Sequence, residues 1–323
     1  MKSKSIIKVI VFFLILNFLL ISSSHITKKI AVEKQDLGLL KRNGIEIELL
    51  KEKRNSIDVL FLGDSECYTS YSPMQIWGEK GITSFVCAQS GQTPGESFHL
   101  INLALKQQMP KVVFMEMNLY FQYSGAIPAA KDLFVNTVND FYSVVSYHSV
   151  WKSAFDVKEK NSQSFKGFNV YSGVIPSQYP ADYMNISKEN CKMSFYNKMM
   201  LMRTVNKIKS HNAKIVFYSA PSPKNHNMEK HNVIASLAKH YNVPYIDLNL
   251  KPEVGIDLNK DILDGGDHIN ISGAEKTSTY FAKYLIQYNL RDKRCDPKFK
   301  DWNDEEVKYK KFTSKLIQDI RVV

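Results

Sequence analysis

Five short apolar segments, separated by stretches with helical periodicity, constrain the fold of this 323-residue chain more than any other feature. Apolar runs that alternate with amphipathic helices are typical of a parallel sheet that helices cover on both faces. The helix expected over residues 94–108 has the clearest start, with Thr93 as its N-cap and Pro94 at its first position. We therefore predict an α/β protein. The expected strands cover residues 57–62, 82–86, 112–117, 214–219 and 244–248.

Further stretches with helical periodicity lie between and after these strands. Ser272 is the expected N-cap of the last helix, because a serine hydroxyl accepts hydrogen bonds from the first backbone N–H groups of a helix. Residues 57–288 are therefore expected to form one α/β body, and residues 289–323 a charged surface helix packed on it. The other expected helices cover residues 194–211, 228–241 and 273–288.

A long segment, about residues 119–191, separates the third expected strand from the fourth. It is too long for a plain crossover, so we predict a helical insertion, or cap. Its aromatic side chains suit extra core packing, and they equally suit a lid or an acceptor groove, because aromatic faces fit sugar rings and membrane interfaces. Both alternatives stay open. The aromatic residues are Tyr120, Phe121, Tyr123, Phe134, Phe141, Tyr142, Tyr147, Trp151 and Phe155.

The N-terminus carries a lysine-flanked apolar run over residues 9–21. Counted from residue 6 to residue 24, it approaches the ~20 residues that span a bilayer. The positive charge before the run predicts that the N-terminus lies inside and the body outside the membrane. A cleaved signal peptide and an uncleaved signal anchor both fit, and the anchor is favoured because no Ala-x-Ala cleavage site follows. We expect an anchor over residues 1–24 and a juxtamembrane linker with a polar helix over residues 25–56.

The net charge of +11 has two interpretations. Lysines can be spread over solvated faces, or they can attract anionic lipid headgroups or an anionic surface polymer. No nucleic-acid partner is expected, since the chain has no zinc-ligand spacing and no glycine-rich phosphate loop.

Cysteine spacing argues against metal and redox chemistry. No CxxC is present, so zinc binding and thioredoxin-type reactions are not expected, and the spacing is unlike a disulfide framework. One bridge would suit an oxidising compartment, but the sequence does not assign it. We expect no metal and no cofactor. The cysteines are Cys67, Cys87, Cys191 and Cys295.

Two short polar motifs carry the chemistry. Ser65 follows the first expected strand in a Gly-Asp-Ser turn, at the sheet edge where open α/β folds bind ligands. His268 lies in an acid-rich loop before the last expected helix. A serine hydroxyl becomes a nucleophile when a histidine takes its proton, and a carboxylate orients and stabilises that histidine. Ser65 and His268 are therefore the predicted nucleophile and base.

Two acids compete for the third position of this triad. Asp264 lies four residues before His268, and Asp267 lies one before it. The intervening Gly265-Gly266 pair would let the backbone bulge and bring Asp264 under the imidazole ring. Asp267, adjacent in sequence, would point away on an extended loop. Asp264 is favoured, and both stay candidates.

These motifs resemble the SGNH/GDSL hydrolase superfamily over roughly residues 57–288, outside the anchor and much of the cap. The resemblance implies a flavodoxin-like, three-layer α/β/α sandwich. It implies that Ser65 is the nucleophile and His268 the base. It also implies an oxyanion hole that includes Gly91, from Ser90-Gly91-Gln92, and Asn118, from Glu116-Met117-Asn118.

The sequence departs from the family pattern in two places. The family acid lies three residues before the histidine, where this chain has Gly265. The usual Gly-x-Asn-Asp of the third block is missing, so Asn118 fits equally well as a strand-end turn residue.

An anchored, outward-facing body is similar to the branch of the superfamily that modifies cell-surface polymers with membrane-bound O-acyltransferases, in polysaccharide acetylation or teichoic acid D-alanylation. The resemblance implies ping-pong acyl transfer through an acyl-serine to a glycan or polymer acceptor. The alternatives are an esterase that removes acyl groups from a surface glycan, and a non-catalytic, membrane-tethered glycan-binding protein.

Overall fold

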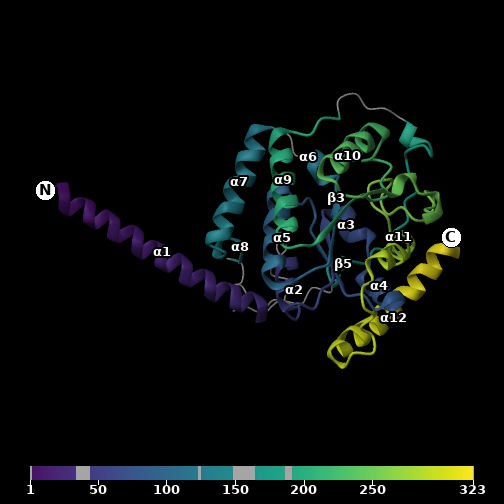
Figure 1. Cartoon of the computed structure of the whole chain (residues 1–323), viewed down its shortest axis with the longest axis horizontal. Coiled ribbons are helices and arrows are strands. Elements are labelled where there is room, and N and C mark those ends of the chain that lie inside the picture. The colour runs from purple at the N-terminus through teal and green to yellow at the C-terminus, as the bar shows by residue number, and fades with distance from the viewer. Residues whose placement is uncertain (1, 34–43, 123–124, 148–163, 186–190, 323) are drawn as a thin grey trace.

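The computed structural model describes residues 2–33, 44–122, 125–147, 164–185 and 191–322. A five-stranded parallel sheet forms the centre of the body, with the strand order β2-β1-β3-β6-β7 (Figure 1). Every residue of the first three strands is buried, as expected for a sheet that is covered on both faces. The strands are β1 (Val59–Gly63), β2 (Ser84–Ala88), β3 (Val112–Glu116), β6 (Lys214–Ser219) and β7 (Tyr245–Asp247).

This strand order confirms the predicted fold class. Numbered along the chain, the five strands lie in the order 2-1-3-4-5, which is the flavodoxin-like order. The connections diverge between β1 and β3, and open α/β sheets bind ligands at the carboxyl ends of the strands that flank such a point. The fold therefore favours a site where β1 and β3 end.

Helices cover both faces of the sheet (Figure 1). One face carries α5 and α9, and α5 begins with the predicted Thr93 cap, which forms a capping box with Glu96. The other face carries α3, α4 and α11, with α12 packed outside α4, as expected for the tail. These helices are α3 (Ser65–Ser70), α4 (Pro73–Lys80), α5 (Pro94–Gln107), α9 (Phe195–Lys209), α10 (Met228–Tyr241), α11 (Ile271–Tyr284) and α12 (Lys300–Val322).

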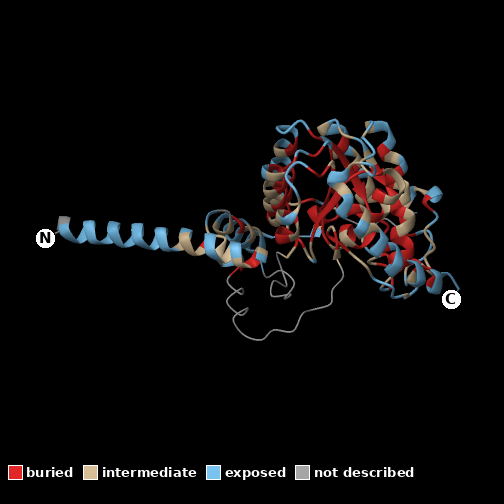
Figure 2. Cartoon of the chain, turned by 90° about the horizontal axis from the view of Figure 1, so that it is seen from below, coloured by how far each residue is buried: buried red, intermediate tan, exposed pale blue. Residues whose placement is uncertain are grey.

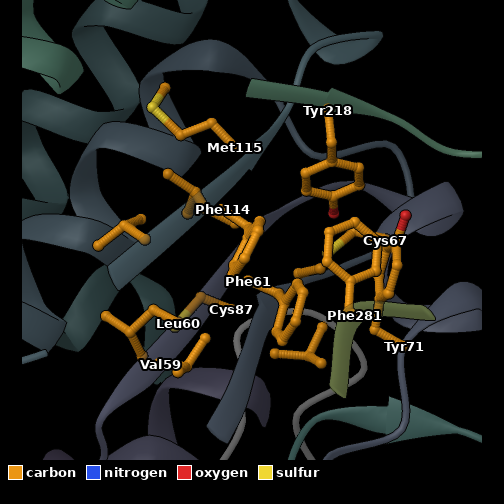
Figure 3. Close-up of a cluster of buried hydrophobic side chains, with 14 of the residues drawn as sticks. Val59, Leu60, Phe61, Cys67, Tyr71, Cys87, Phe114, Met115, Tyr218 and Phe281 are labelled. Carbon is orange, nitrogen blue, oxygen red and sulfur yellow. The ribbon is translucent and has the colours of Figure 1, made fainter. Parts of the chain in front are cut away.

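Aromatic rings fix α11 to the sheet (Figure 3). Phe61 of β1 stacks on Phe114 of β3 at 4.9 Å, and Phe281 of α11 meets Phe114 edge-on at 4.9 Å. Tyr71 stacks on Phe61 at 4.9 Å from the end of α3. Because α11 is held this way, the loop that precedes it is held at a defined place above the sheet.

The start of α11 differs from the prediction. Asn270, and not Ser272, is the N-cap, and its side-chain oxygen accepts hydrogen bonds from the backbone N–H groups of Ser272 and Gly273. The helix therefore begins at Ile271, and Ser272 lies inside its first turn as a donor to the cap. Short 3₁₀ turns occur at Leu248–Leu250, Pro252–Val254, Leu285–Tyr288 and Pro297–Phe299.

The insertion after β3 is helical where it is described. Helix α7 packs on α5, and α8 packs on the N-terminal helix. Tyr120 and Tyr147 are buried, whereas Phe134 and Phe141 are exposed, so core packing accounts for only part of the aromatic content. Tyr123, Trp151 and Phe155 lie outside the described residues. The elements are α6 (Leu119–Gln122), α7 (Ala126–Phe141), α8 (Val144–Tyr147), β4 (Ser164–Phe165), β5 (Phe168–Asn169) and a 3₁₀ turn at Tyr183–Asn185.

The N-terminal helix α1 (Lys2–Glu33) projects from the body with its apolar side chains exposed (Figure 2). It is long and apolar enough to cross a membrane. Helix α2 (Gly44–Lys51) differs from the polar linker helix that we expected, because Ile45 and Leu49 join the hydrophobic core of the body. Cys67 and Cys87 are buried free thiols, and Cys295 is an exposed one.

Phe281→Ala should lower the free energy of unfolding of the body by about 3–5 kcal/mol, because the ring is fully buried between α11 and the sheet. Denaturant unfolding of the detergent-solubilised chain, followed by near-ultraviolet circular dichroism, measures this. Phe312→Ala on the outer helix α12, where the ring is 39% exposed, is the matched control and should cost clearly less. Equal losses would contradict the role given to Phe281.

Candidate active site

Ser65 lies where β1 turns into α3, at the carboxyl edge of the sheet. Asp64 is the N-cap of α3, and its Oδ1 accepts a 3.0 Å hydrogen bond from the backbone N–H of Glu66. A Cβ at Gly63 would lie 2.6 Å from the Cβ atoms of both Cys67 and Glu116, so only glycine allows α3 and β3 to approach this closely. The Gly-Asp-Ser turn therefore holds a half-buried Ser65 beside the end of β3.

His268 is oriented by Asp264. Its Nδ1 lies 2.6 Å from Asp264 Oδ2, and its backbone N–H donates to Asp264 Oδ1 at 2.9 Å. A carboxylate can only accept, so this contact places the proton on Nδ1 and leaves Nε2 as the basic nitrogen. Nε2 is buried and has no hydrogen-bond partner among the described residues. His268 is therefore arranged as a base with its reactive nitrogen available.

Two glycines produce the four-residue spacing between acid and histidine. Gly265 has φ = 84° and Gly266 has φ = 132°, a region that favours glycine. A Cβ at Gly266 would lie 2.7 Å from the Tyr179 ring, so this backbone also passes too close to its neighbour for any side chain. This is the bulge that the sequence predicted, and it folds Asp264 back under His268.

Asp267 has other partners. Its carboxylate accepts from Lys224 Nζ at 2.6 Å and from Asn225 Nδ2 at 2.5 Å. Partial burial raises the pKa of Asp267, but the hydrogen bond from Lys224 and the charges of His268 and Lys224 together hold it below its usual range. Asp267 thus holds its loop against the segment before α10. Its carboxylate accepts from Lys224 and Asn225, whereas Nδ1 of the His268 ring bonds Asp264, so the geometry does not favour Asp267 as the catalytic acid.

Asn225 joins the serine turn to the histidine loop. Its Nδ2 donates to Glu66 Oε1 at 2.7 Å and to Asp267 Oδ1 at 2.5 Å. Glu66 follows Ser65 and Asp267 precedes His268, so this one amide bonds the residue after the predicted nucleophile to the residue before the predicted base.

Asp64 has an unusual carboxyl group. Burial raises its pKa to about 7, the neighbouring charge of Glu66 adds to the rise, and the nearby His268 opposes it. Its Oδ2 also accepts a hydrogen bond from Gln122 Nε2 at 3.0 Å. These contacts favour a bracing role for Asp64.

The two predicted oxyanion-hole residues follow β2 and β3, the strands on either side of β1. The β1–β2 register pairs Gly63 with Ala88, so Gly91, three residues further on, lies at the same edge as Ser65. Asn118 is buried, and its Nδ2 donates to Glu66 Oε1 at 2.7 Å. One hydrogen of the Asn118 amide is thus used by Glu66, and the oxyanion role of both residues stays a prediction.

A buried acid–histidine cluster beneath the serine was not foreseen from the sequence. Glu66, Glu116 and His226 are each at least 97% buried. His226 Nε2 lies 3.2 Å from Glu66 Oε2 and 4.0 Å from Glu116 Oε1. Burial raises the pKa of Glu116 well above its usual range. The three residues lie far apart in the chain, so no spacing pattern predicted the cluster.

Two groups in the described part of the chain have spacing that a metal ion could use. The ligand atoms of Glu66, Glu116 and His226 lie within 4.8 Å of one another, as do those of a second group. In both groups the carboxylates already accept hydrogen bonds, including those from Asn118 to Glu116 and Glu66. Because these carboxylate oxygens already accept hydrogen bonds, the geometry favours a structural hydrogen-bond network over a metal site. The second group is Asp264, Asp267 and His268.

A comparison with protein-family models finds no match, and a comparison with curated proteins finds none either. Among solved structures, a GDSL-like lipase from Bacteroides thetaiotaomicron is 13% identical, with a TM-score of 0.40 over 79% of this chain and 100% of that one. The psychrotrophic esterase EstA from Pseudoalteromonas sp. is 12% identical, with a TM-score of 0.40 over 72% of this chain and 97% of that one. A lipase/acylhydrolase from Enterococcus faecalis is 12% identical, with a TM-score of 0.39 over 74% of this chain and 100% of that one. These likenesses concern the overall fold, and the roles of individual residues rest on the geometry described above.

Asp264→Asn should lower kcat for ester turnover by about 10²–10⁴-fold, because the ring loses the carboxylate that fixes its tautomer and stabilises its charged form. Asp267→Asn should cost less than about fivefold, since it removes a partly exposed ion pair with Lys224. Steady-state rates of the two variants on one activated ester measure both effects. Equal or reversed losses would show that Asp264 is not the acid of the triad.

Asp64→Asn should gain stability relative to wild type as the pH rises from about 4 to about 7. The folded pKa is raised from an ordinary 3.8 to about 7, so the native state holds a proton that the unfolded state has lost, and wild type loses stability across this window. The gain should reach up to about 4 kcal/mol. Denaturant unfolding at several pH values measures it.

Asp267→Asn is the control of opposite sign. The pKa of Asp267 is lowered in the folded state, so its carboxylate stabilises the wild-type fold at neutral pH. This stabilisation is lost as the pH falls below the ordinary aspartate pKa towards the lowered one, so Asp267→Asn should be less stable than wild type at neutral pH and approach it in acid. A stability difference between Asp64→Asn and wild type that does not change with pH would contradict the buried, protonated Asp64.

Proposed function

We propose that this chain is a membrane-anchored serine enzyme that transfers an acyl group to a hydroxyl of a cell-surface polysaccharide or teichoic-acid-like polymer. One observation carries the proposal. The Asp264–His268 pair keeps an unpartnered, buried Nε2 on a loop that Asn225 ties to the Ser65 turn.

In the first half-reaction, Ser65 Oγ attacks the carbonyl carbon of the donor ester while His268 Nε2 takes the hydroxyl proton. Asp264 stabilises the imidazolium that forms. The tetrahedral oxyanion is held by preorganised donors, for which the backbone N–H groups of Ser65 and Gly91 and the amide of Asn118 are the candidates. As the intermediate collapses, His268 gives its proton to the leaving oxygen, and the acyl group stays on Ser65.

In the second half-reaction, an acceptor hydroxyl attacks the acyl-serine. His268 takes the acceptor's proton and returns it to Ser65 Oγ, so the enzyme is regenerated and the acceptor carries the new ester. A membrane-bound O-acyltransferase is the proposed source of the acyl group. The apolar helix α1, preceded by lysines, supports an anchored body outside the membrane, where such polymers lie.

Hydrolysis is the second candidate, because water can reach this site. The Asp264 side chain is 37% exposed and the His268 side chain 18%. An esterase would use the same first half-reaction, with water in place of the acceptor hydroxyl.

Mixing the full-length chain in detergent with an activated acetyl ester should add the mass of one acetyl group to the protein, as measured on the intact protein. Ser65→Ala should gain none and should lose at least about 10³-fold in turnover. Ser90→Ala is the matched control, because Ser90 is an exposed serine on the neighbouring strand-end loop, and it should still be labelled.

The lifetime of the adduct separates the candidates. A transferase keeps the acetyl group in water and loses it when oligosaccharide acceptors are added, with the acetyl group recovered on the sugar. An esterase loses it in water at the same rate with or without acceptor. Labelling that persists in Ser65→Ala would contradict Ser65 as the nucleophile. No labelling and no turnover at all would contradict the proposal and favour a glycan-binding protein.

A further inference from the structure

Helix α7 exposes its apolar side. Ile127, Phe134 and Phe141 are 83%, 70% and 71% exposed. They are spaced seven residues apart, so they lie along one stripe of the helix. Three large apolar side chains in one exposed stripe form a patch of the kind that marks a protein or membrane contact. We call these three residues the α7 stripe.

The opposite side of α7 is polar and faces the body. Asp132 accepts hydrogen bonds from Thr93 Oγ1 at 2.5 Å, from the Gly95 N–H at 2.8 Å and from Tyr196 OH at 2.6 Å. Asn136 is 8% exposed and donates to Asp132 Oδ1 at 2.6 Å. A surface helix of a water-soluble body has the reverse arrangement. The hydrogen bonds thus hold α7 in an orientation that leaves its apolar stripe outward.

The end of α7 lies against the candidate membrane helix. Tyr142 OH donates to Asn17 Oδ1 at 2.9 Å, and the Val144 N–H donates to Ser24 Oγ at 3.0 Å. Asn17 and Ser24 are seven residues apart in α1, which is about 10 Å along a helix axis. These contacts fall in the C-terminal part of the apolar segment of α1, on the side nearer the body.

We propose that α7 lies in the boundary between headgroups and acyl chains of the bilayer that α1 crosses, with the α7 stripe in contact with lipid acyl chains. An amphipathic helix in this position buries its apolar face by about 5–10 Å. With the outer end of the span at Ser24, the bond from Tyr142 to Asn17 and the bond from Val144 to Ser24 place the end of α7 within about 10 Å of that outer end. Figure 1 shows α7 running steeply across the axis of α1, which is the orientation of a helix that lies along the membrane plane.

Lipid is favoured over a protein partner because the stripe continues an apolar surface that a bilayer must cover. Phe18 and Ile21 of α1 are 69% and 53% exposed in the same stretch as the Asn17 and Ser24 contacts. The proposal requires α1 to cross a bilayer, but it does not depend on the acyl-transfer chemistry.

A second attachment would fix how the body stands on the membrane. A single span leaves the body free to rotate and tilt, whereas α7 is bonded to α5 through Asp132. Lipid contact along α7 would therefore set the height and tilt of the whole sheet, and with them the distance of the Ser65 edge from the membrane.

The test is the Phe134→Trp variant of the full-length chain in nanodiscs, made with phosphatidylcholine that carries bromine on its acyl chains. Bromine quenches tryptophan only on close contact, so the emission that Trp adds at position 134, after subtraction of the wild-type signal, should be mostly lost relative to unbrominated discs. Its emission maximum should also shift to the blue. Phe312→Trp on α12, on the far side of the body from α1, is the matched control and should keep its emission (Figure 1).

Equal emission of the Phe134→Trp variant in brominated and unbrominated discs would overturn lipid contact and leave a protein partner as the occupant of the stripe. Unchanged near-ultraviolet circular dichroism of both variants excludes misfolding as the cause of any difference. Ester turnover by the variants, measured in the same discs, separates this result from a failure of the proposed function, because Phe134 and Phe312 lie outside the candidate site.

Discussion

Two carboxylates buried side by side beneath the serine turn organise the rest of the site. The close approach that Gly63 permits brings Glu66 and Glu116 together in a region without solvent. Buried charges persist only when they are hydrogen-bonded or neutralised. Glu66 is accordingly bonded by three residues from two different segments: Asn118 after β3, and Asn225 and His226 before α10. The hydrogen bonds to the Glu66 carboxylate therefore fix the ends of β1 and β3 and the segment before α10 relative to one another.

The same requirement for hydrogen-bonded carboxylates gives the two acids of the last loop, Asp264 and Asp267, different roles. Asn225, already bonded to Glu66, also bonds Asp267, and Lys224 neutralises Asp267. Asp267 is thereby committed to holding the loop, which leaves Asp264 for His268. Lys230 adds a positive charge beside the buried cluster, where its Nζ donates to Asn118 Oδ1 at 2.7 Å. The imidazolium that forms during catalysis would sit among carboxylates, which is the electrostatic setting that stabilises it.

Local patterns predicted the sheet, its main helices and the Gly265-Gly266 bulge, because each depends on residues close together in the chain. The sequence did not predict the cluster of Glu66, Glu116 and His226, because only the strand order brings these residues together. The charged, mixed composition of residues 25–56 predicted a linker, yet Ile45 and Leu49 of helix α2 reach the core. The inverted polarity of α7 was also invisible, because periodicity gives the two sides of a helix and not which side faces the body.

The central claim is that Ser65 and His268 act as one catalytic unit. The most direct test compares ester turnover by Ser65→Ala, by His268→Ala and by the double variant. Residues that act together in one proton transfer are strongly non-additive, so the account predicts that the double variant is no slower than either single variant. Losses that multiply in the double variant, or a His268→Ala enzyme with near wild-type turnover, would contradict it.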